Sequence, residues 1–129
     1  INGAFYVCKE LLPKMIKRKN GAIVNISSIA GLVGNIGQSN YSTSKGALIS
    51  FTKSLALETA RYNIRVNCIA PGVVKSSMTK ALPEDEVKKL IPLKRYAEPE
   101  EIAEVVFFIA DKAGYITGEV INVSGGMVR

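Results

Sequence analysis

Residues 22–27 (Ala-Ile-Val-Asn-Ile-Ser) form a nearly continuous apolar run that follows Gly21 and precedes a segment rich in serine and glycine. A run that is apolar on both faces is typical of a strand buried inside a parallel sheet. A second such run covers 64–70 and ends at Pro71-Gly72, and a shorter one covers 120–123. We therefore expect three strands.

Helical patterns surround these strands. The first, residues 1–19, ends before Gly21 and carries an apolar stripe of Ala4, Phe5, Cys8, Leu11, Leu12 and Met15. The second, 41–62, carries Ala47, Leu48, Phe51 and Leu55. The third opens at Pro99, and its buried face holds Ile102, Val105, Val106 and Ile109. Alternating strands and helices predict an α/β fold with right-handed crossovers and a parallel sheet.

Tyr41 and Lys45 are the strongest chemical signal in the sequence. Residues four apart share a helix face, so a phenol and an ammonium can meet over one reacting centre. Ser28 ends the strand that precedes them and could hold a carbonyl or alcohol oxygen for the phenol. The chain has no histidine, which makes tyrosine the leading candidate for a general acid or base.

Such a pair is weak evidence when taken alone. With five tyrosines and many lysines, a chance Tyr-x-x-x-Lys is common, and most such pairs lie on a solvated helix face. The setting strengthens the functional interpretation. Ser28 and Pro71-Gly72 both end strands, and ligands of open α/β sheets bind at the carboxyl ends of strands.

Longer motifs make a family resemblance visible. They are residues 22–31, residues 37–41 together with Lys45, and residues 65–72. With these motifs the chain resembles the short-chain dehydrogenase/reductase family over essentially its whole length. Further segments are most similar to the 3-oxoacyl-[acyl-carrier-protein] reductases of that family: Gly34-Asn35, Gly37-Gln38, 91–93, 115–118 and 125–127.

The resemblance implies a role for each matching residue. Tyr41 would be the general acid or base, Ser28 would orient the substrate oxygen, and Lys45 would lower the tyrosine pKa while holding the nicotinamide ribose. Asn2 would hold a water in the proton relay. The cofactor-binding segment would comprise Pro71, Gly72, Val74 and Ser76, together with Tyr41 and Lys45. We expect NADP(H) rather than NAD(H) as the cofactor.

One part of the family pattern is not found in these residues. No G-x-G-x-x-G turn occurs, although that turn places the cofactor pyrophosphate on a helix amino terminus. We therefore expect residues 1–129 to be the carboxyl-terminal, catalytic half of a single Rossmann-like domain with a doubly wound sheet. The half that binds the cofactor phosphates would lie outside them, and residues 1–129 alone would be inactive.

A net charge of +6 could suggest nucleic acid or an acidic membrane surface as a partner. The basic residues, however, lie in separate segments, and no nucleic-acid-binding motif is present. A solvated surface is the plain interpretation. The alternative is docking of an acidic protein, because the resemblance implies that acyl carrier protein docks near Arg18, Lys19 and Arg61.

Cys8 and Cys68 lack metal-ligand spacing and a redox C-x-x-C arrangement. Buried free thiols are the expected state, which fits a reducing, cytoplasmic location. No apolar run is long enough for a membrane span, so no membrane association is expected. The resemblance also implies a homotetramer.

The leading hypothesis is an oxidoreductase of fatty acid biosynthesis that reduces a 3-oxoacyl thioester to the 3-hydroxyacyl product. One alternative keeps the mechanism and changes the substrate to a sugar, steroid or small ketone. Another is an inactive fragment that serves as a structural or interaction module. Residues 75–93 are polar and punctuated by proline, and could be either a substrate-covering lid or a plain surface excursion.

Overall fold

Three parallel strands form one sheet in the order β1-β2-β3. The computed structural model describes residues 1–128 and gives these strands as β1 (Gly21–Ile26), β2 (Ile64–Pro71) and β3 (Val120–Val123). The register pairs Gly21 with Ile64 and Cys68 with Val120. The predicted strands and their parallel pairing are confirmed.

The central strand is almost entirely buried, which accounts for its mostly apolar sequence. Within β2, the residues Val66, Cys68, Ile69 and Ala70 have no exposed surface, and only Arg65 is partly exposed. Strand neighbours cover the two edges of β2 and helices cover its two faces, which keeps the other side chains away from water. This burial is the main hydrophobic contribution of the sheet.

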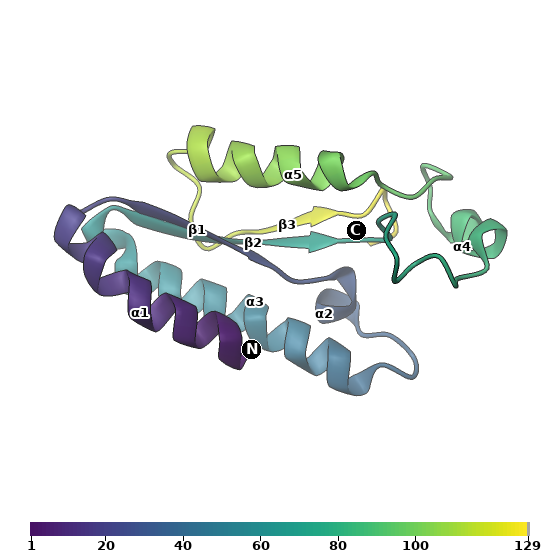
Figure 1. Ribbon diagram of the computed structural model, residues 1–129, viewed down its shortest axis with the longest axis horizontal. Helices are drawn as coiled ribbons and strands as arrows, with labels where there is room; N and C mark the ends of the chain where they lie inside the picture. Colours follow the sequence, from purple (N-terminus) through teal and green to yellow (C-terminus); the bar gives the residue numbers. More distant parts are fainter. Residues whose placement is uncertain (129) are drawn as a thin grey trace.

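Helices cover both faces of the sheet (Figure 1). Helices α1 (Asn2–Arg18) and α3 (Ser39–Thr59) lie on one face, and α5 (Pro99–Phe107) lies on the other. The core between α1, α3 and the sheet consists of Cys8, Leu55, Ala56, Ile64 and Val66. This packing places the amino-terminal half of α3 beside the end of β1.

The ends of the first two long helices meet. Lys19 ends α1 in a left-handed conformation with φ 49°, and Lys17 and Arg18 lie in the last turn, where cations complement the helix dipole. Helix α3 stops at Thr59 and continues as a 3₁₀ turn, η1 (Ala60–Tyr62). The Asn63 side chain then donates a hydrogen bond of 3.2 Å to the Lys19 carbonyl.

The structure departs from the sequence pattern in two places. Gly31, Gly34 and Gly37 predict a loop, but Gly31 lies in a short helix, α2 (Ile29–Val33), because Ser28 caps its first turn. Phe5 and Leu11 belong to the predicted apolar stripe of the first helix but are 48% and 43% exposed. Helix α1 is an outer helix, so only the narrow side around Cys8 faces the core.

The remaining helical segments are short. The expected lid contains α4 (Glu84–Leu90), and α5 continues as a π-helical turn, η2 (Phe108–Lys112), that buries Ile109. The Arg65 guanidinium donates hydrogen bonds of 2.7 Å to the carbonyls of Ile109 and Ala110 in this turn. Among residues 1–128, no helix combines the length and apolarity that crossing a bilayer requires.

Candidate active site

Ser28 lies at the carboxyl end of β1, where it begins α2. Its backbone is extended, and its hydroxyl oxygen accepts a hydrogen bond of 3.2 Å from the Ala30 amide. A hydroxyl that accepts in this way keeps its own hydrogen for donation. The local turn therefore fixes the Ser28 oxygen at the edge of the sheet while leaving it able to donate to a ligand.

Tyr41 and Lys45 lie one turn apart near the start of α3. The Lys45 Nζ is 5.7 Å from the centroid of the Tyr41 ring, which is 40% exposed. The same ammonium donates a hydrogen bond of 2.9 Å to the Ile26 carbonyl, two residues before Ser28. Lys45 therefore connects the tyrosine to the end of the strand that carries the serine.

Backbone contacts hold α3 in this position. The buried Ser27 hydroxyl donates a hydrogen bond of 2.8 Å to the Lys45 carbonyl. A Cβ atom on Gly31 would lie 2.7 Å from the Lys45 carbonyl carbon, so α2 and α3 approach more closely than any larger residue allows. Sequence reasoning did not assign these roles, and the adjacent Ser-Ser and the glycine three residues later were the available signals.

A buried polar pair extends this support deeper into the sheet. The Asn25 amide donates a hydrogen bond of 2.9 Å to the Thr52 hydroxyl, which in turn donates one of 2.8 Å to the Leu48 carbonyl. Asn25 interrupts the apolar sequence of β1. Its side chain joins that strand to the middle of α3 through the hydrogen bond to Thr52. Thr52 is fully buried.

The two cysteines are free and buried, as predicted. Burial raises the pKa of the Cys68 thiol, and it also raises the pKa of the Cys8 thiol. Both groups therefore remain protonated at neutral pH, and a protonated thiol is a poor nucleophile.

The segment predicted to touch a cofactor follows β2. Pro71 pairs with Val123, and the Gly72 amide donates a hydrogen bond of 2.9 Å to the Val123 carbonyl. A Cβ atom on Gly72 would lie 2.9 Å from the Ser124 Cα, so a glycine is needed where these backbones meet. Because Ile26 pairs with Ile69, this segment and Ser28 lie at the same edge of the sheet.

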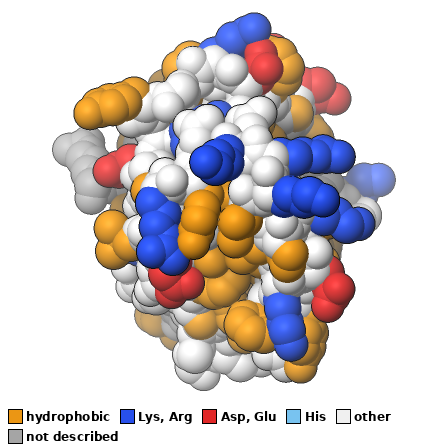
Figure 2. Space-filling view, turned by 90° about the vertical axis from the view of Figure 1, so that its left-hand side faces the viewer, with side chains coloured by type: hydrophobic (Ala, Val, Ile, Leu, Met, Phe, Trp, Pro, Cys, Tyr) orange, Lys and Arg blue, Asp and Glu red, His pale blue; other side chains and the backbone are white. Residues whose placement is uncertain are grey.

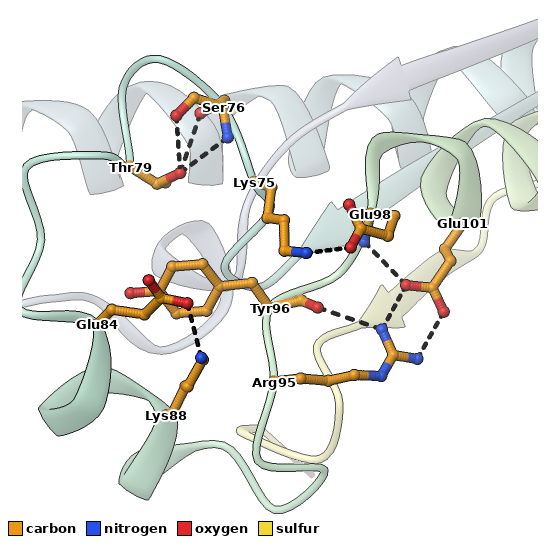
Figure 3. Close-up of polar contacts among 9 residues, drawn as sticks. All are labelled: Lys75, Ser76, Thr79, Glu84, Lys88, Arg95, Tyr96, Glu98 and Glu101. Carbon is orange, nitrogen blue, oxygen red and sulfur yellow. Dashed lines mark hydrogen bonds and ion pairs between the residues drawn. The ribbon is translucent and has the colours of Figure 1, made fainter.

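Ser76 and Thr79 form a small hydroxyl cluster beyond this segment (Figure 3). The Ser76 amide donates a hydrogen bond of 2.9 Å to the Thr79 hydroxyl, which donates one of 2.8 Å to the Val74 carbonyl. Val74 itself bridges to Ala97. Thr79 was not predicted from the sequence, although Ser-x-x-Thr after a strand is a common turn motif.

Asn2 opens α1, the helix whose Phe5 ring lies 6.2 Å from the ring of Phe51 in α3, ten residues after Tyr41. Among residues 1–128, no side-chain hydrogen bond joins Asn2 to Ser28, Tyr41 or Lys45, and its role in a proton relay stays a prediction.

Lys45 and Gly72 are suited to the nicotinamide-ribose end of a cofactor. Ile26 accepts one of the three hydrogens of the Lys45 ammonium, which leaves two for ribose hydroxyl oxygens. Gly72 follows Pro71 at the carboxyl end of β2, the edge of the sheet where ligands of open α/β sheets bind. These residues fit the nicotinamide-ribose end, whereas residues 1–129 contain no glycine-rich phosphate turn.

The base of the 75–97 excursion is fastened by ion pairs and backbone hydrogen bonds (Figure 3). Lys75 pairs with Glu98, and the Lys75 amide donates a hydrogen bond of 2.9 Å to the Ala97 carbonyl. Arg95 forms two hydrogen bonds with Glu101, of 2.6 and 2.7 Å, which hold the pKa of that carboxyl down at about 2. The excursion is thus anchored to the first turn of α5.

Comparison with known proteins gives a consistent match. The family model described as enoyl-(acyl carrier protein) reductase matches residues 1–128. The 3-oxoacyl-[acyl-carrier-protein] reductase of Aquifex aeolicus is 53% identical over 98% of this chain and 53% of its own length. The enzyme of that name from Thermotoga maritima is 47% identical over 99% of this chain and 54% of its own length.

Two further comparisons agree. Carbonyl reductase family member 4 of Xenopus laevis is 52% identical over 97% of this chain and 52% of its own length. The crystal structure of 3-oxoacyl-[acyl-carrier protein] reductase from Brucella melitensis superimposes with a TM-score of 0.93 at 36% identity, covering 98% of this chain and 49% of that one. The chain spans about half the length of the relatives it matches.

Proposed function

Because the chain belongs to the short-chain dehydrogenase/reductase family, we propose that it carries the catalytic residues of a reductase that converts a 3-oxoacyl thioester into its 3-hydroxyacyl product. One observation carries this proposal: the Lys45 ammonium lies 5.7 Å from the centroid of the Tyr41 ring and donates a hydrogen bond to the carbonyl of Ile26, two residues before Ser28. The names of the Aquifex, Thermotoga and Brucella relatives support the choice of substrate.

In the proposed reaction, the residues of this chain manage the substrate oxygen. The Ser28 hydroxyl donates a hydrogen bond to the ketone oxygen, and the Tyr41 phenol gives its proton to that oxygen as the carbonyl is reduced. The Lys45 ammonium stabilises the resulting phenolate by its positive charge. When bound, a reduced nicotinamide supplies the hydride to the carbonyl carbon.

We propose NADP(H) rather than NAD(H) as that cofactor. Lys45 would hold the ribose, and Pro71, Gly72 and Val74 would line the nicotinamide end. Ser76 would offer its amide or hydroxyl to the carboxamide or a phosphate. The preference for NADP(H) rests on the family resemblance, because the residues that select the 2′-phosphate in Rossmann-like domains belong to the phosphate-binding region.

We further propose that residues 1–129 act as the catalytic half of one Rossmann-like domain. Within the described residues β1 pairs only with β2, so its other edge can accept a further strand. The missing phosphate turn is consistent with phosphate contacts supplied by residues outside this segment.

An acyl carrier protein is the proposed partner. Arg18, Lys19 and Arg61 are exposed at the end of the molecule where the α1–β1 and α3–β2 connections lie. Figure 2 shows lysine and arginine side chains gathered around hydrophobic ones on this face. Positive charge there suits an acidic carrier protein. The six residues of β1, about 20 Å of strand, separate this face from Ser28. The group that links the acyl chain to the carrier protein would have to span a comparable distance.

The remaining proposals concern assembly and location. Phe107, Phe108 and Tyr115 are 60%, 51% and 103% exposed, which supports burial of this face between subunits of a homotetramer. A cytoplasmic location and a place in fatty acid biosynthesis follow from the family and from the free thiols. Light scattering would test the assembly directly.

A fusion protein provides the activity test. It carries the amino-terminal half of the Aquifex aeolicus relative in front of residues 1–129. We expect it to consume NADPH with an acetoacetyl thioester, whereas residues 1–129 alone should show no turnover. A crotonyl thioester tests reduction of a carbon–carbon double bond instead, and acetone tests a small ketone.

The outcomes separate the hypotheses. Turnover confined to crotonyl thioester would replace the ketone reductase with an enoyl reductase. Turnover confined to acetone would indicate a different ketone substrate. A folded fusion protein that binds NADPH and turns over none of the three would support the non-catalytic module.

A further inference from the structure

Two segments that are far apart in the sequence meet beside the end of β3. They are residues 91–93 (Ile-Pro-Leu) and the turn that follows the strand, residues 124–126 (Ser-Gly-Gly). The Leu93 amide donates a hydrogen bond of 3.2 Å to the Gly125 carbonyl. Neither segment takes part in the proposed proton transfer. Their contact instead concerns the 75–97 excursion, whose second half contains residues 91–93.

The turn after β3 requires glycine twice. Gly125 and Gly126 have φ angles of 62° and 89°, in the left-handed region that favours glycine. A Cβ atom on Gly125 would lie 3.0 Å from the Cγ2 atom of Ile91, and one on Gly126 would lie 3.0 Å from the Cγ atom of Pro92. The two glycines therefore leave the space that the side chains of residues 91 and 92 occupy.

Ile91 is the buried residue of this contact. Its side chain is 2% exposed, whereas the preceding residue, Leu90, is 70% exposed. None of residues 75–90 is buried, and α4 lies beyond the end of the sheet (Figure 1). A hollow of about 440 Å³ also separates the first part of the excursion from the chain that returns to α5. Residues 76–90 are therefore loosely packed, and firm packing begins at Ile91.

The other end of the excursion is also fixed. Val74 forms a bridge with Ala97, and the Ala97 amide donates a hydrogen bond of 3.0 Å to the Val73 carbonyl. Residues 76–90 thus run between two anchors, a proximal one at 73–75 and a distal one at Ile91. Segments with few buried contacts open at a low cost in free energy, so motion should be confined between these anchors.

The distal anchor adjoins the segment proposed to hold the cofactor. Ser124 belongs to the turn that receives Ile91, and a Cβ atom on Gly72 would lie 2.9 Å from the Ser124 Cα. A small cavity of about 90 Å³ is lined by Val73, Ile91 and Gly125, among other residues. The same turn therefore supports both the proposed cofactor segment and the distal end of the excursion.

We propose that Ile91 and Gly125 are positioning residues for a substrate lid. They fix its distal end, so that residues 76–90 alone close over the substrate at the carboxyl edge of the sheet. The inference rests on the proposed reductase function. Fixing the distal end shortens the segment that closing must order, which reduces the entropic cost of substrate binding. Loss of the anchor should therefore weaken substrate binding more than it slows the chemical step.

Hydrogen exchange of the fusion protein, followed by NMR, tests where the moving part ends. In the free protein we expect slow exchange at the amides of Lys75, Leu93 and Ala97, whose hydrogen bonds hold the anchors, and fast exchange across 77–81. NADP⁺ and an acetoacetyl thioester together form a complex that cannot react, because no hydride is available. That complex should slow exchange within 76–90 and leave exchange at Leu93 unchanged.

Kinetics of variants of the fusion protein test the anchor itself. Ile91→Ala should raise the KM for the thioester about tenfold, change kcat less, and speed exchange at Leu93. Ile91→Val keeps both γ carbons and should restore most of the parental KM. Val7→Ala shortens an exposed side chain of α1 and is the control that should keep the parental KM.

A double substitution tests the contact between the two positioning residues. The methyl group added by Gly125→Ala would meet the Ile91 side chain, so this variant should also raise KM and speed exchange at Leu93. Ile91→Ala removes the atom that this methyl group meets. The increase in KM of the double variant should therefore be smaller than the product of the two single increases. An increase equal to that product would overturn the pairing of the two residues in one anchor.

Failure of this inference is distinct from failure of the proposed function. Equal exchange rates at Leu93 and across 77–81 in the free protein, or a parental KM in Ile91→Ala, would overturn the distal anchor and leave turnover by Tyr41 standing. Equal slowing of exchange at Leu93 and within 76–90 on substrate binding would overturn it as well. A fusion protein without thioester turnover would overturn the proposed function, while exchange in the free protein would still test the anchor.

Discussion

The buried Ser27 hydroxyl donates a hydrogen bond of 2.8 Å to the main-chain carbonyl of Lys45. This contact ties the end of β1 to the turn of α3 that carries Lys45, with Tyr41 one turn earlier. Ser27 is therefore a positioning residue for the proposed proton transfer, whereas its neighbour Ser28 offers its hydroxyl to the substrate. The two adjacent serines have different tasks because they face opposite sides of the strand end.

Ser27→Ala should lower kcat of the fusion protein about tenfold, because a shift of α3 misplaces the tyrosine and lysine together. The KM for the thioester should change less, since Ser28 is retained. Steady-state kinetics measure both constants. Ser50→Ala, at an exposed serine of the same helix, is the control and should keep parental kinetics. Parental kcat in Ser27→Ala would show that the hydrogen bond is dispensable.

Tyr41→Phe should reduce turnover of the acetoacetyl thioester by about 100- to 10,000-fold, the usual contribution of general acid–base catalysis. Binding of NADPH should stay nearly intact because the ring remains. Fluorescence titration measures that binding in parallel with the kinetics. Tyr6→Phe, at an exposed tyrosine of α1, is the matched control. Retention of most activity in Tyr41→Phe would remove this residue as the proton donor.

Gly31→Ala should destabilise the protein by about 1–3 kcal/mol, because the added methyl group would meet the Lys45 backbone and force α2 away from α3. Gly3→Ala is the contrasting change: nothing lies within 4 Å of its Cβ position in α1. It should stabilise the helix by up to about 0.5–1 kcal/mol. Urea unfolding measures both, and equal effects of the two changes would contradict the close packing of α2 on α3.

Thr52→Val should destabilise the protein by about 1–3 kcal/mol, since it leaves the buried Asn25 amide without its acceptor at nearly constant volume. Thr43→Val, at an exposed position of the same helix, should have a much smaller effect. The comparison uses chemical denaturation. A loss in Thr52→Val no larger than that in Thr43→Val would mean that Asn25 finds another partner.

The Arg95–Glu101 pair predicts a response to acid. The pKa of Glu101 is lowered from 4.5 to about 2, chiefly by the Arg95 hydrogen bonds. The pair therefore contributes stability that is fully present above about pH 5 and is lost as the pH falls through about 2. NMR titration of the Glu101 carboxyl carbon measures this pKa directly.

Arg95→Gln should bring the Glu101 titration back toward its ordinary range and should weaken the attachment of the 75–97 excursion to α5. The pKa of Glu84, which Lys88 lowers, provides an internal control and should not move. An unchanged Glu101 titration in Arg95→Gln would show that the amide hydrogen bond within the helix cap is sufficient to keep the carboxyl ionised.

Local patterns predicted most of the elements and failed where the cause was not local. The apolar run at 64–70 predicted a strand because nearly every residue of the central strand is buried. Gly31, Gly34 and Gly37 predicted a loop, but the first of them lies in a short helix that Ser28 caps. Phe5 and Leu11 share the predicted apolar stripe of α1 and yet are exposed, because periodicity identifies a stripe but not how much of it another helix covers.

The candidate site also combines features that local sequence predicts with features that depend on long-range packing. The four-residue spacing of Tyr41 and Lys45 placed them on one helix face, because helical geometry acts within a single segment. Their approach to the end of β1 joins residues up to 19 positions apart, and it depends on Ser27 and Gly31 holding two segments together. Asn2 was grouped with them by resemblance, and no side-chain hydrogen bond among residues 1–128 joins it to Tyr41 or Lys45.

The amino-acid sequence by itself determined the strands, the main helices and the shared face of Tyr41 and Lys45, since these follow from hydrophobic periodicity and short-range geometry. Only the tertiary structure decided that Lys45 reaches the Ile26 carbonyl and that the hydroxyls of Ser27 and Thr52 bond to α3. Contacts of this kind depend on how distant segments pack, and the packing of one pair of elements constrains all the others.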